Sequence, residues 1–282
     1  MKNILILVII VFLTGSCINK KISQTDVFNP IKEYELNTDF EFNRHFIQNS
    51  DSTRIESWYI TEKNPQFNLI YLSGNGSNIR SAIPFFNALG EQTNLNIFSF
   101  NYSGYGLSNG TPTIDGIVND ANHALNYFNE IKNNTLPTIL LGYSLGGYVA
   151  LNLYENTGID KVVLMSTFSS LEELEIYLKK ETIPFVVRPF LNLNIEEKVY
   201  RLNNIERIAK LEKPLLVIHG GNDTFIPPQM GKKLFDLSPS KNKEFIQIDG
   251  ADHRMVLKDD EKSMLVAGEI IRFVNSNQIV FK

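Results

Sequence analysis

The sequence predicts an α/β fold, in which a mostly parallel central sheet is covered by helices on both faces. Short apolar or β-branched runs alternate with stretches of helical periodicity along most of the chain, as expected for strands joined by crossover helices. The chain has 282 residues with 43% hydrophobic content, which is enough to bury one large core. We therefore expect one main domain, over residues 38–282.

The first two predicted strands differ from the others. Residues 40–47 and 54–60 flank the turn-rich stretch Asn49-Ser50-Asp51-Ser52 and predict an antiparallel pair. The alternation of strands and helices begins after them. The remaining predicted strands are 67–72, 96–102, 138–143, 161–165, 214–219 and 244–248, and the predicted helices are 79–89, 117–131, 146–154, 230–237 and 261–275.

A serine stands at a sharp turn between one of these strands and the next helix, in Gly142-Tyr143-Ser144-Leu145-Gly146. A turn that lifts a serine hydroxyl clear of the sheet needs a strained backbone at the serine and almost no side chain two residues to either side. Glycine meets that need. The motif alone arises by chance in roughly one chain in ten of this length, but here the strand and helix that it requires surround it. The pattern predicts a nucleophile elbow at Ser144.

The amino terminus has the features of a signal peptide. Lys2 precedes an apolar run over residues 4–13, and small residues lead from there to Cys17, the only cysteine in the chain. A membrane-spanning helix needs about 20 apolar residues, and this run is shorter. The segment resembles a bacterial lipoprotein signal, in which cleavage leaves the cysteine first in the mature chain and lipidated.

We therefore expect a signal peptide over residues 1–16 and a polar tether over residues 17–37, with a lipid on Cys17 that anchors the protein to a membrane of the cell envelope. Lipoprotein signals usually have leucine three residues before the cysteine, where this chain has Thr14. Cleavage without lipidation, which would give a secreted or periplasmic protein, stays an alternative.

Charge and residue spacing argue against several classes of function. The net charge of −4 comes with scattered Lys and Arg, so we expect no nucleic-acid partner. The loop with Gly74 and Gly76 lacks the third glycine of a dinucleotide fingerprint, and no phosphate-loop motif follows, so we expect no cofactor. We expect no metal either, because the four histidines are far apart and lack cysteine companions; they are His45, His123, His219 and His253.

Two polar loops after predicted strands complete a catalytic pattern with Ser144. Asp223 follows the strand 214–219, and His253 follows the strand 244–248. In sheets of this kind chemistry gathers at the carboxyl ends of the strands. A serine hydroxyl needs an imidazole to take its proton and a carboxylate to orient that imidazole. We expect Ser144, Asp223 and His253 to act together; Asp252 is a rival acid, but as the neighbour of His253 in an extended loop it is expected to point away.

Residues 67–115, 137–171 and 205–257 resemble the α/β-hydrolase superfamily, most closely small-lid serine hydrolases that are thioesterase-like, monoacylglycerol-lipase-like or serine-aminopeptidase-like. The resemblance rests on Gly142-Tyr143-Ser144-Leu145-Gly146-Gly147 and on His219-Gly220-Gly221-Asn222-Asp223. It implies an α/β-hydrolase fold with Ser144 as nucleophile, Asp223 as orienting acid and His253 as base. It also implies that the backbone N–H groups of Asn75 and Leu145 form the oxyanion hole. The chain departs from the family at Ser73, Asn101 and Ser103, where relatives often have His, Asp and Arg.

Relatives carry a lid where this chain has residues 166–211. A charged helix over 172–180 is expected there, followed by the apolar run 183–191, which two prolines interrupt. Phe185, Val187 and Phe190 are expected either to pack the lid on the core or to line an acyl pocket above the elbow.

The function that we expect is hydrolysis of a small acyl ester or thioester through an acyl-enzyme. A serine aminopeptidase and a non-catalytic envelope binding protein are the alternatives.

Overall fold

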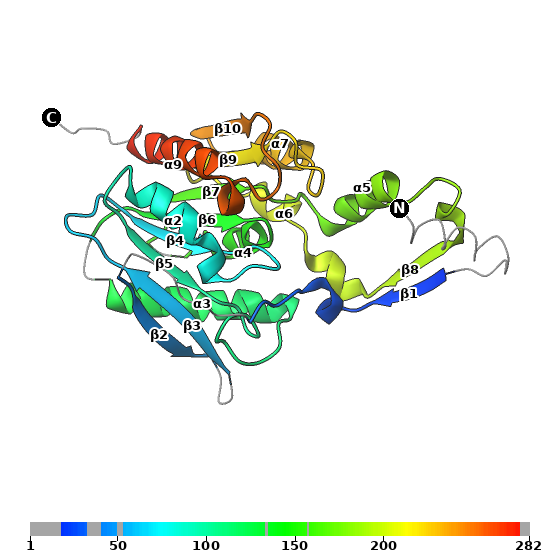
Figure 1. Cartoon of the computed structure of the whole chain (residues 1–282), viewed down its shortest axis with the longest axis horizontal. Coiled ribbons are helices and arrows are strands. Elements are labelled where there is room, and N and C mark those ends of the chain that lie inside the picture. Colours follow the sequence, from blue (N-terminus) through cyan, green and yellow to red (C-terminus); the bar gives the residue numbers. More distant parts are fainter. Residues whose placement is uncertain (1–17, 33–40, 50–52, 133–134, 157, 277–282) are drawn as a thin grey trace.

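The computed structural model describes residues 18–32, 41–49, 53–132, 135–156 and 158–276. Its centre is an eight-stranded sheet with the order β10-β9-β7-β6-β4-β5-β3-β2, in which β2, β3 and β5 pair antiparallel and the other pairings are parallel (Figure 1). The strands are β2 (Asn43–Gln48), β3 (Arg54–Ile60), β4 (Asn68–Leu72), β5 (Asn96–Phe100), β6 (Thr138–Tyr143), β7 (Lys161–Met165), β9 (Leu215–Gly220) and β10 (Lys243–Ile248).

Helices cover both faces of the sheet, so its central strands are apolar on both sides. Leu140 of β6 packs in the core on one face, and its neighbours Ile139 and Leu141 pack in the core on the other. The first face carries α3 (Ile114–Ile131), α4 (Leu145–Leu153), α6 (Ile205–Ile208) and α7 (Pro228–Leu237), and the second carries α2 (Ile83–Gly90), α8 (Met255–Lys258) and α9 (Asp260–Asn275). The predicted α/β class is confirmed.

Most predicted strands and helices are found with shifted ends. The predicted helix over 79–89 begins as the 3-10 helix η2 (Ile79–Ala82) and becomes α2 where Pro84 occupies the first turn. Helix α3 begins at Ile114, earlier than predicted, because Thr113 caps it: its hydroxyl accepts a 3.0 Å hydrogen bond from the Gly116 N–H. The turn predicted between β2 and β3 lies partly outside the described residues.

An arm projects from the body of the molecule (Figure 1). It consists of α5 (Leu171–Thr182), η3 (Arg188–Phe190), β8 (Leu191–Ile195) and β1 (Ile18–Ile22). The two strands pair parallel, with Ile18 opposite Leu191 and Ile22 opposite Ile195. Helix α5 is the charged helix that the sequence predicts, with Glu172 and Glu173 in its first turn and basic residues in its last turn. The 3-10 helix η4 (Glu197–Arg201) follows β8.

The start of the described chain differs from the polar tether expected over residues 17–37. After β1 comes the 3-10 helix η1 (Gln24–Val27), and Phe28 is buried in the core. The Gln24 N–H donates to the Glu196 carboxylate at 3.0 Å, and the Glu196 N–H donates to Ile22 O at 2.9 Å. Residues 18–32 are therefore attached to the rest of the protein by their apolar side chains and by paired backbone groups. This segment is not a free spacer. Within the described ranges, no helix has the length and apolar character that crossing a membrane requires.

Candidate active site

Ser144 lies at the turn between β6 and α4, as the motif predicts. Its φ of 52° is in the left-handed region that non-glycine residues rarely adopt. Hydrogen bonds hold the peptide groups on both sides of this residue. The Ser144 N–H donates to Met165 O at 2.9 Å, and the Thr167 hydroxyl donates to Ser144 O at 2.6 Å. The surrounding structure therefore fixes the strained turn.

The glycines of the motif allow α4 to approach the sheet closely. A Cβ on Gly142 would lie 2.3 Å from Gly146 O, and a Cβ on Gly146 would lie 2.1 Å from Leu72 O. Backbone atoms cannot yield that much space, so any side chain at these positions would push α4 away from β4 and β6. The two glycines thus fix the position of the serine above the sheet.

The side chains of Ser144, His253 and Asp223 form a continuous line of hydrogen bonds. His253 Nε2 lies 3.1 Å from Ser144 Oγ, and His253 Nδ1 lies 2.7 Å from Asp223 Oδ2. An ionised carboxylate can only accept, so Nδ1 carries the hydrogen and Nε2 presents a lone pair to the serine hydroxyl. The structure brings together the three residues that the sequence predicts for the site, in a geometry suited to proton transfer from the serine.

Asp223 is buried and stays ionised. Burial raises the pKa of its carboxyl group, but hydrogen bonds from His219 and His253 outweigh burial and lower the pKa to about 2. Its second oxygen accepts from the backbone N–H groups of Phe225 and Ile226, at 3.0 and 2.8 Å. The carboxylate is therefore charged at neutral pH and held on both oxygens.

His253 is positioned by its neighbours as well as by Asp223. The Tyr143 hydroxyl donates to His253 O at 2.8 Å, and the Phe225 ring meets the imidazole edge-on at 5.1 Å between centroids. Burial, followed by the Asp223 charge, raises the pKa of Tyr143, so its hydroxyl remains a donor. The loop that carries His253 is thus tied to the elbow itself.

The rival acid, Asp252, has a different hydrogen-bond partner. Asp252 is exposed, and its carboxylate accepts a 2.7 Å hydrogen bond from the Arg254 N–H. His219 is buried at the end of β9, where Nε2 donates to Ile226 O at 2.9 Å. The same nitrogen lies 3.4 Å from Asp223 Oδ2, a contact that the sequence does not predict. His45 lies on β2, beside Tyr127.

Asn75 and Leu145 lie beside Ser144, where oxyanion donors are expected. Leu145 is the first residue of α4, so its N–H has no partner within the helix. Asn75 belongs to the loop between β4 and η2. Gly74 in that loop is so near the elbow that a Cβ on it would lie 3.1 Å from Ser144 Cβ. Asn75, Ser144 and His253 all line one cavity of about 630 Å³.

A segment that the sequence does not predict at the site holds the Asn75 loop. We call residues 23–31 the N-terminal strap. Asn75 Nδ2 donates to Val27 O at 2.7 Å, and Asn75 Oδ1 accepts from the Asn29 N–H at 2.8 Å. The Tyr105 hydroxyl also donates to Asn75 Oδ1, at 2.8 Å, and the Gly106 N–H donates to Ile31 O at 2.8 Å. The strap therefore fixes the side chain of a residue whose N–H is expected to serve catalysis.

The cavity around Ser144 has an apolar part and a basic rim. Its apolar lining residues are Ile31, Tyr143, Phe225 and Leu257, and Arg254 and Lys258 also line it. The run 183–190 does not line it: Phe185 is exposed and Val187 is buried in the arm. Of the two alternatives for Phe185, Val187 and Phe190, an acyl pocket above the elbow is therefore not what the described residues form. Ile183, at the start of the run, lines a separate apolar cavity of about 350 Å³ on the arm, together with Leu178 and Leu193. The pairing of β1 with β8 holds the run on the arm instead of above the elbow.

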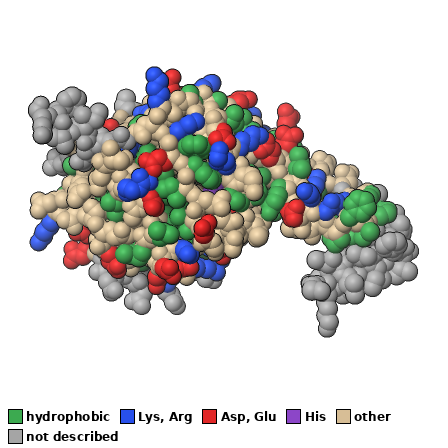
Figure 2. Space-filling model, turned by 90° about the horizontal axis from the view of Figure 1, so that it is seen from above, with side chains coloured by type: hydrophobic (Ala, Val, Ile, Leu, Met, Phe, Trp, Pro, Cys, Tyr) green, Lys and Arg blue, Asp and Glu red, His purple; other side chains and the backbone are tan. Residues whose placement is uncertain are grey.

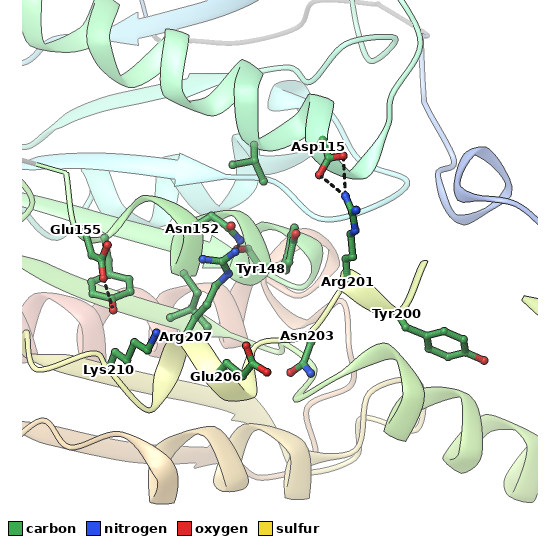
Figure 3. A pocket seen from close by; sticks show the side chains of 13 residues that line it. Asp115, Tyr148, Asn152, Glu155, Tyr200, Arg201, Asn203, Glu206, Arg207 and Lys210 are labelled. Carbon is green, nitrogen blue, oxygen red and sulfur yellow. Dashed lines mark hydrogen bonds and ion pairs between the residues drawn. The ribbon is translucent and has the colours of Figure 1, made fainter. Parts of the chain in front are cut away.

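A second cavity of about 630 Å³ is lined by residues of α3, α4, η4 and α6 (Figure 3). It is lined by charged and polar residues, and in Figure 3 Arg201 points toward Asp115, with which it forms an ion pair of 3.1 Å. None of its lining residues lines the Ser144 cavity, and none is Ser, Cys or His. The hydrogen-bonded side chains of Ser144 and His253 line the other cavity.

Two further observations concern the expected partners. Cys17 and residues 1–16 lie outside the described residues. Among the residues that the structure does describe, His, Cys, Asp and Glu side chains form no group of three or more that could hold a metal ion.

Comparison with known proteins places these features in a family. The family described as "alpha/beta hydrolase fold" matches residues 68–182, and "Serine aminopeptidase, S33" matches residues 201–261. The uncharacterized protein YfhR of Escherichia coli (strain K12) is 31% identical over 212 residues, which are 72% of this chain and 70% of YfhR. The uncharacterized membrane protein YNL320W of Saccharomyces cerevisiae is 26% identical, over 74% of this chain and 72% of its own.

A solved structure gives the same result for the fold. The Pyrococcus furiosus esterase Pf2001 superposes with a TM-score of 0.69 at 20% sequence identity, covering 88% of this chain and 96% of the esterase. Together with the elbow and the sheet order, these matches support a hydrolase, and the chain belongs to the α/β-hydrolase superfamily.

Proposed function

We propose that this protein is a serine hydrolase that cleaves a carboxylic ester or thioester through an acyl-enzyme. The observation that carries the proposal is the line of hydrogen bonds from Ser144 through His253 to Asp223, set on a strained elbow. No cofactor takes part in this reaction.

In the proposed mechanism Ser144 Oγ attacks the substrate carbonyl carbon while His253 Nε2 takes the hydroxyl proton. The Asp223 carboxylate stabilises the imidazolium ion that forms. The N–H groups of Asn75 and Leu145 stabilise the negative charge on the carbonyl oxygen. The imidazolium then gives its proton to the leaving alcohol or thiol, and the acyl group stays on Ser144. A water molecule, deprotonated by His253, then attacks the carbonyl carbon of the ester that joins the acyl group to Ser144. This step releases the carboxylic acid, and His253 returns a proton to Ser144 Oγ.

The cavity favours an acyl substrate over a peptide with a free amino terminus. An aminopeptidase needs acidic groups to hold the substrate ammonium, but the described lining contains no Asp or Glu and has Arg254 and Lys258. Its apolar residues suit an acyl chain. The esterase with the same fold is consistent with this choice. The aminopeptidase remains a second candidate, because that family matches residues 201–261.

A fluorophosphonate probe tests the proposal, because only an activated serine attacks phosphorus readily. We expect the wild type to be labelled and Ser144→Ala not to be labelled. Ser81→Ala is the matched control, since Ser81 lines the same cavity. Equal labelling of wild type and Ser144→Ala would refute the assignment of the nucleophile, and absence of labelling in both would favour a non-catalytic binding protein.

A panel of acyl esters, thioesters and amino-acid anilides then separates the two enzymatic candidates. Rapid cleavage of esters or thioesters with slow cleavage of anilides supports the proposal. The opposite order would favour the aminopeptidase.

We also propose that the protein is attached to a membrane of the cell envelope through lipid on Cys17. The support is the sequence of residues 1–17 and the yeast relative that is named a membrane protein. Secretion or a periplasmic location after cleavage without lipidation is the alternative.

A further inference from the structure

The loop that joins α5 to β8 presents apolar side chains to solvent at the far end of the arm. Phe185 is 78% exposed and Val186 is 50% exposed. Figure 2 shows hydrophobic side chains gathered at that end of the molecule, next to basic ones. We call residues 183–190 the arm tip.

The exposure of Phe185 and Val186 follows from an ordered turn. The N–H groups of Val187 and Arg188 both donate to Pro184 O, at 2.9 and 3.3 Å, so the two apolar residues stand at the apex of the turn. Val187 is 4% exposed and anchors the turn in the arm. The turn thus buries Val187 and exposes Phe185 and Val186 to solvent.

The guanidinium group of Arg188 connects the arm tip to the end of α5. Arg188 Nε donates to Ile183 O at 2.9 Å, and its Nη2 donates to Lys180 O. These carbonyls lie at the end of α5, where a positive charge is favourable. The arm tip is therefore built to keep its apolar apex in place.

Basic residues lie on the elements that flank the arm tip, in the last turn of α5 and on β1. Lys180 is 73% exposed in its side chain, and Lys20 and Lys21 are exposed on β1. Two carboxylates offset part of that charge: Glu181 lies 3.9 Å from Lys180, and Asp26 lies close enough to Lys20 to interact with it electrostatically. These three lysines against two carboxylates leave one net positive charge. Apolar side chains flanked by lysines match the interface of a bilayer, where the apolar part enters the boundary with the acyl chains and the lysines meet anionic headgroups.

The first described residue, Ile18, lies beside the base of the arm tip. Ile18 pairs with Leu191, which directly follows η3 at the base of the arm tip. Cys17 is the next residue toward the amino terminus, and the apolar run 4–13 ends five residues before Ile18. A lipid on Cys17 and a retained apolar run would both attach the chain to a bilayer beside the arm tip.

We propose that the arm tip is a membrane-docking surface, with Phe185 and Val186 in the interfacial region of an anionic bilayer. This inference rests on the proposed membrane attachment and adds a second contact that fixes the orientation of the domain. It does not depend on the chemistry at Ser144.

Tryptophan quenching by brominated lipid tests this docking in the full chain. The variant Phe185→Trp places a reporter at an exposed position, where the substitution is tolerated by the fold. It is reconstituted into vesicles of phosphatidylcholine and phosphatidylglycerol, with and without bromine on the acyl chains. Phe46→Trp is the matched control, because Phe46 is an exposed aromatic residue on the edge strand β2, away from the arm. Co-flotation with the vesicles measures attachment separately.

We expect brominated vesicles to quench Phe185→Trp by at least about twofold more than Phe46→Trp, with a blue shift of the added emission. Co-flotation with equal quenching of the two variants would overturn the docking and leave the attachment intact. A blue shift without extra quenching would mean that protein covers the arm tip, which also overturns the proposal. Failure to co-float would overturn both the attachment and the docking.

Discussion

The backbone N–H of Asn29 donates a 2.8 Å hydrogen bond to the side-chain carbonyl of Asn75, 46 residues further along the chain. Together with the bond from Asn75 Nδ2 to Val27 O, it clamps the loop that is expected to supply half of the oxyanion hole. An oxyanion donor works because it is already in place when charge develops on the substrate oxygen. The strap thus provides preorganisation from outside the predicted catalytic residues.

Asn75→Ala keeps the backbone N–H but removes the bonds to the strap. We expect kcat on a preferred ester to fall about tenfold with little change in KM, because the loss acts on the transition state; complete loss of one donor costs about 10²- to 10³-fold. Steady-state kinetics measure this. Asn122→Ala is the control, since Asn122 makes a similar bond to Val118 O on α3. An unchanged kcat would show that the strap does not position the loop.

Asp223→Asn should lower kcat by up to ~10⁴-fold, because the amide would favour the wrong tautomer of His253. Asp252→Asn should stay within about twofold of the wild type, since Asp252 bonds only to its own loop among the contacts seen here. His253→Ala should cost about as much as Ser144→Ala, because the three residues act as a unit. Steady-state kinetics of the four variants show which carboxylate orients His253. A small loss of kcat in Asp223→Asn with a large loss in Asp252→Asn would reverse the assignment.

Asp223 should also make stability depend on pH in the acid range. Its pKa is about 2 in the folded protein and 3.8 ordinarily, a difference worth about 2 kcal/mol. Because the folded pKa is the lower one, this stabilisation is complete above about pH 5 and is lost as the pH falls through 3.8 toward 2. Urea unfolding at several pH values measures the effect. As the pH is lowered, the free energy of unfolding of the wild type should fall more than that of Asp223→Asn. Parallel plots of unfolding free energy against pH for the two proteins would refute the assigned pKa.

The acyl chain of the substrate should pack against Ile31, Phe225 and Leu257. Each buried methylene contributes about 0.8 kcal/mol, so kcat/KM on p-nitrophenyl esters should rise about threefold to fourfold per carbon until the cavity is full. Phe225→Ala should flatten this series, whereas Phe46→Ala, at another exposed aromatic residue, should leave it unchanged. A flat series in the wild type would exclude an acyl pocket here.

Cys17→Ser should move the protein from the membrane to the soluble envelope fraction, because the proposed lipid would have no sulfur to attach to. Fractionation with mass spectrometry of the mature amino terminus measures this. Retention in the membrane with Met1 still present would instead indicate an uncleaved apolar anchor.

The sequence predicts the elements of the site that depend on local sterics or on a single side chain. The elbow is readable because close approach of α4 to the sheet demands Gly142 and Gly146 around Ser144. Asp223 and His253 follow strands and come after Ser144 in the order that the motif requires, which predicts that the three side chains lie together. In the structure His253 lies 2.7 Å from the Asp223 carboxylate and 3.1 Å from Ser144 Oγ. These requirements fix residue types, so they are visible in the sequence.

The strap and the arm are not predictable in the same way. Val27, Asn29 and Ile31 contact the site region through backbone O and N atoms, which any residue would offer, and the polar composition around them resembles a linker. The position of residues 183–190 depends on a strand pairing between distant parts of the chain. Only the buried Phe28 and the apolar residues near it hint at packing in the expected tether.

The pairing of β1 with β8 has a consequence for the order of folding. Gln24 and Glu196 bond to each other across 172 residues of sequence, so the first described residues to be synthesised must wait for β8 before they can pair. Contacts between such distant segments form slowly, because a long loop has to close first. The strap should therefore dock late, and a newly made chain should acquire its compact sheet before the strap aligns the Asn75 loop.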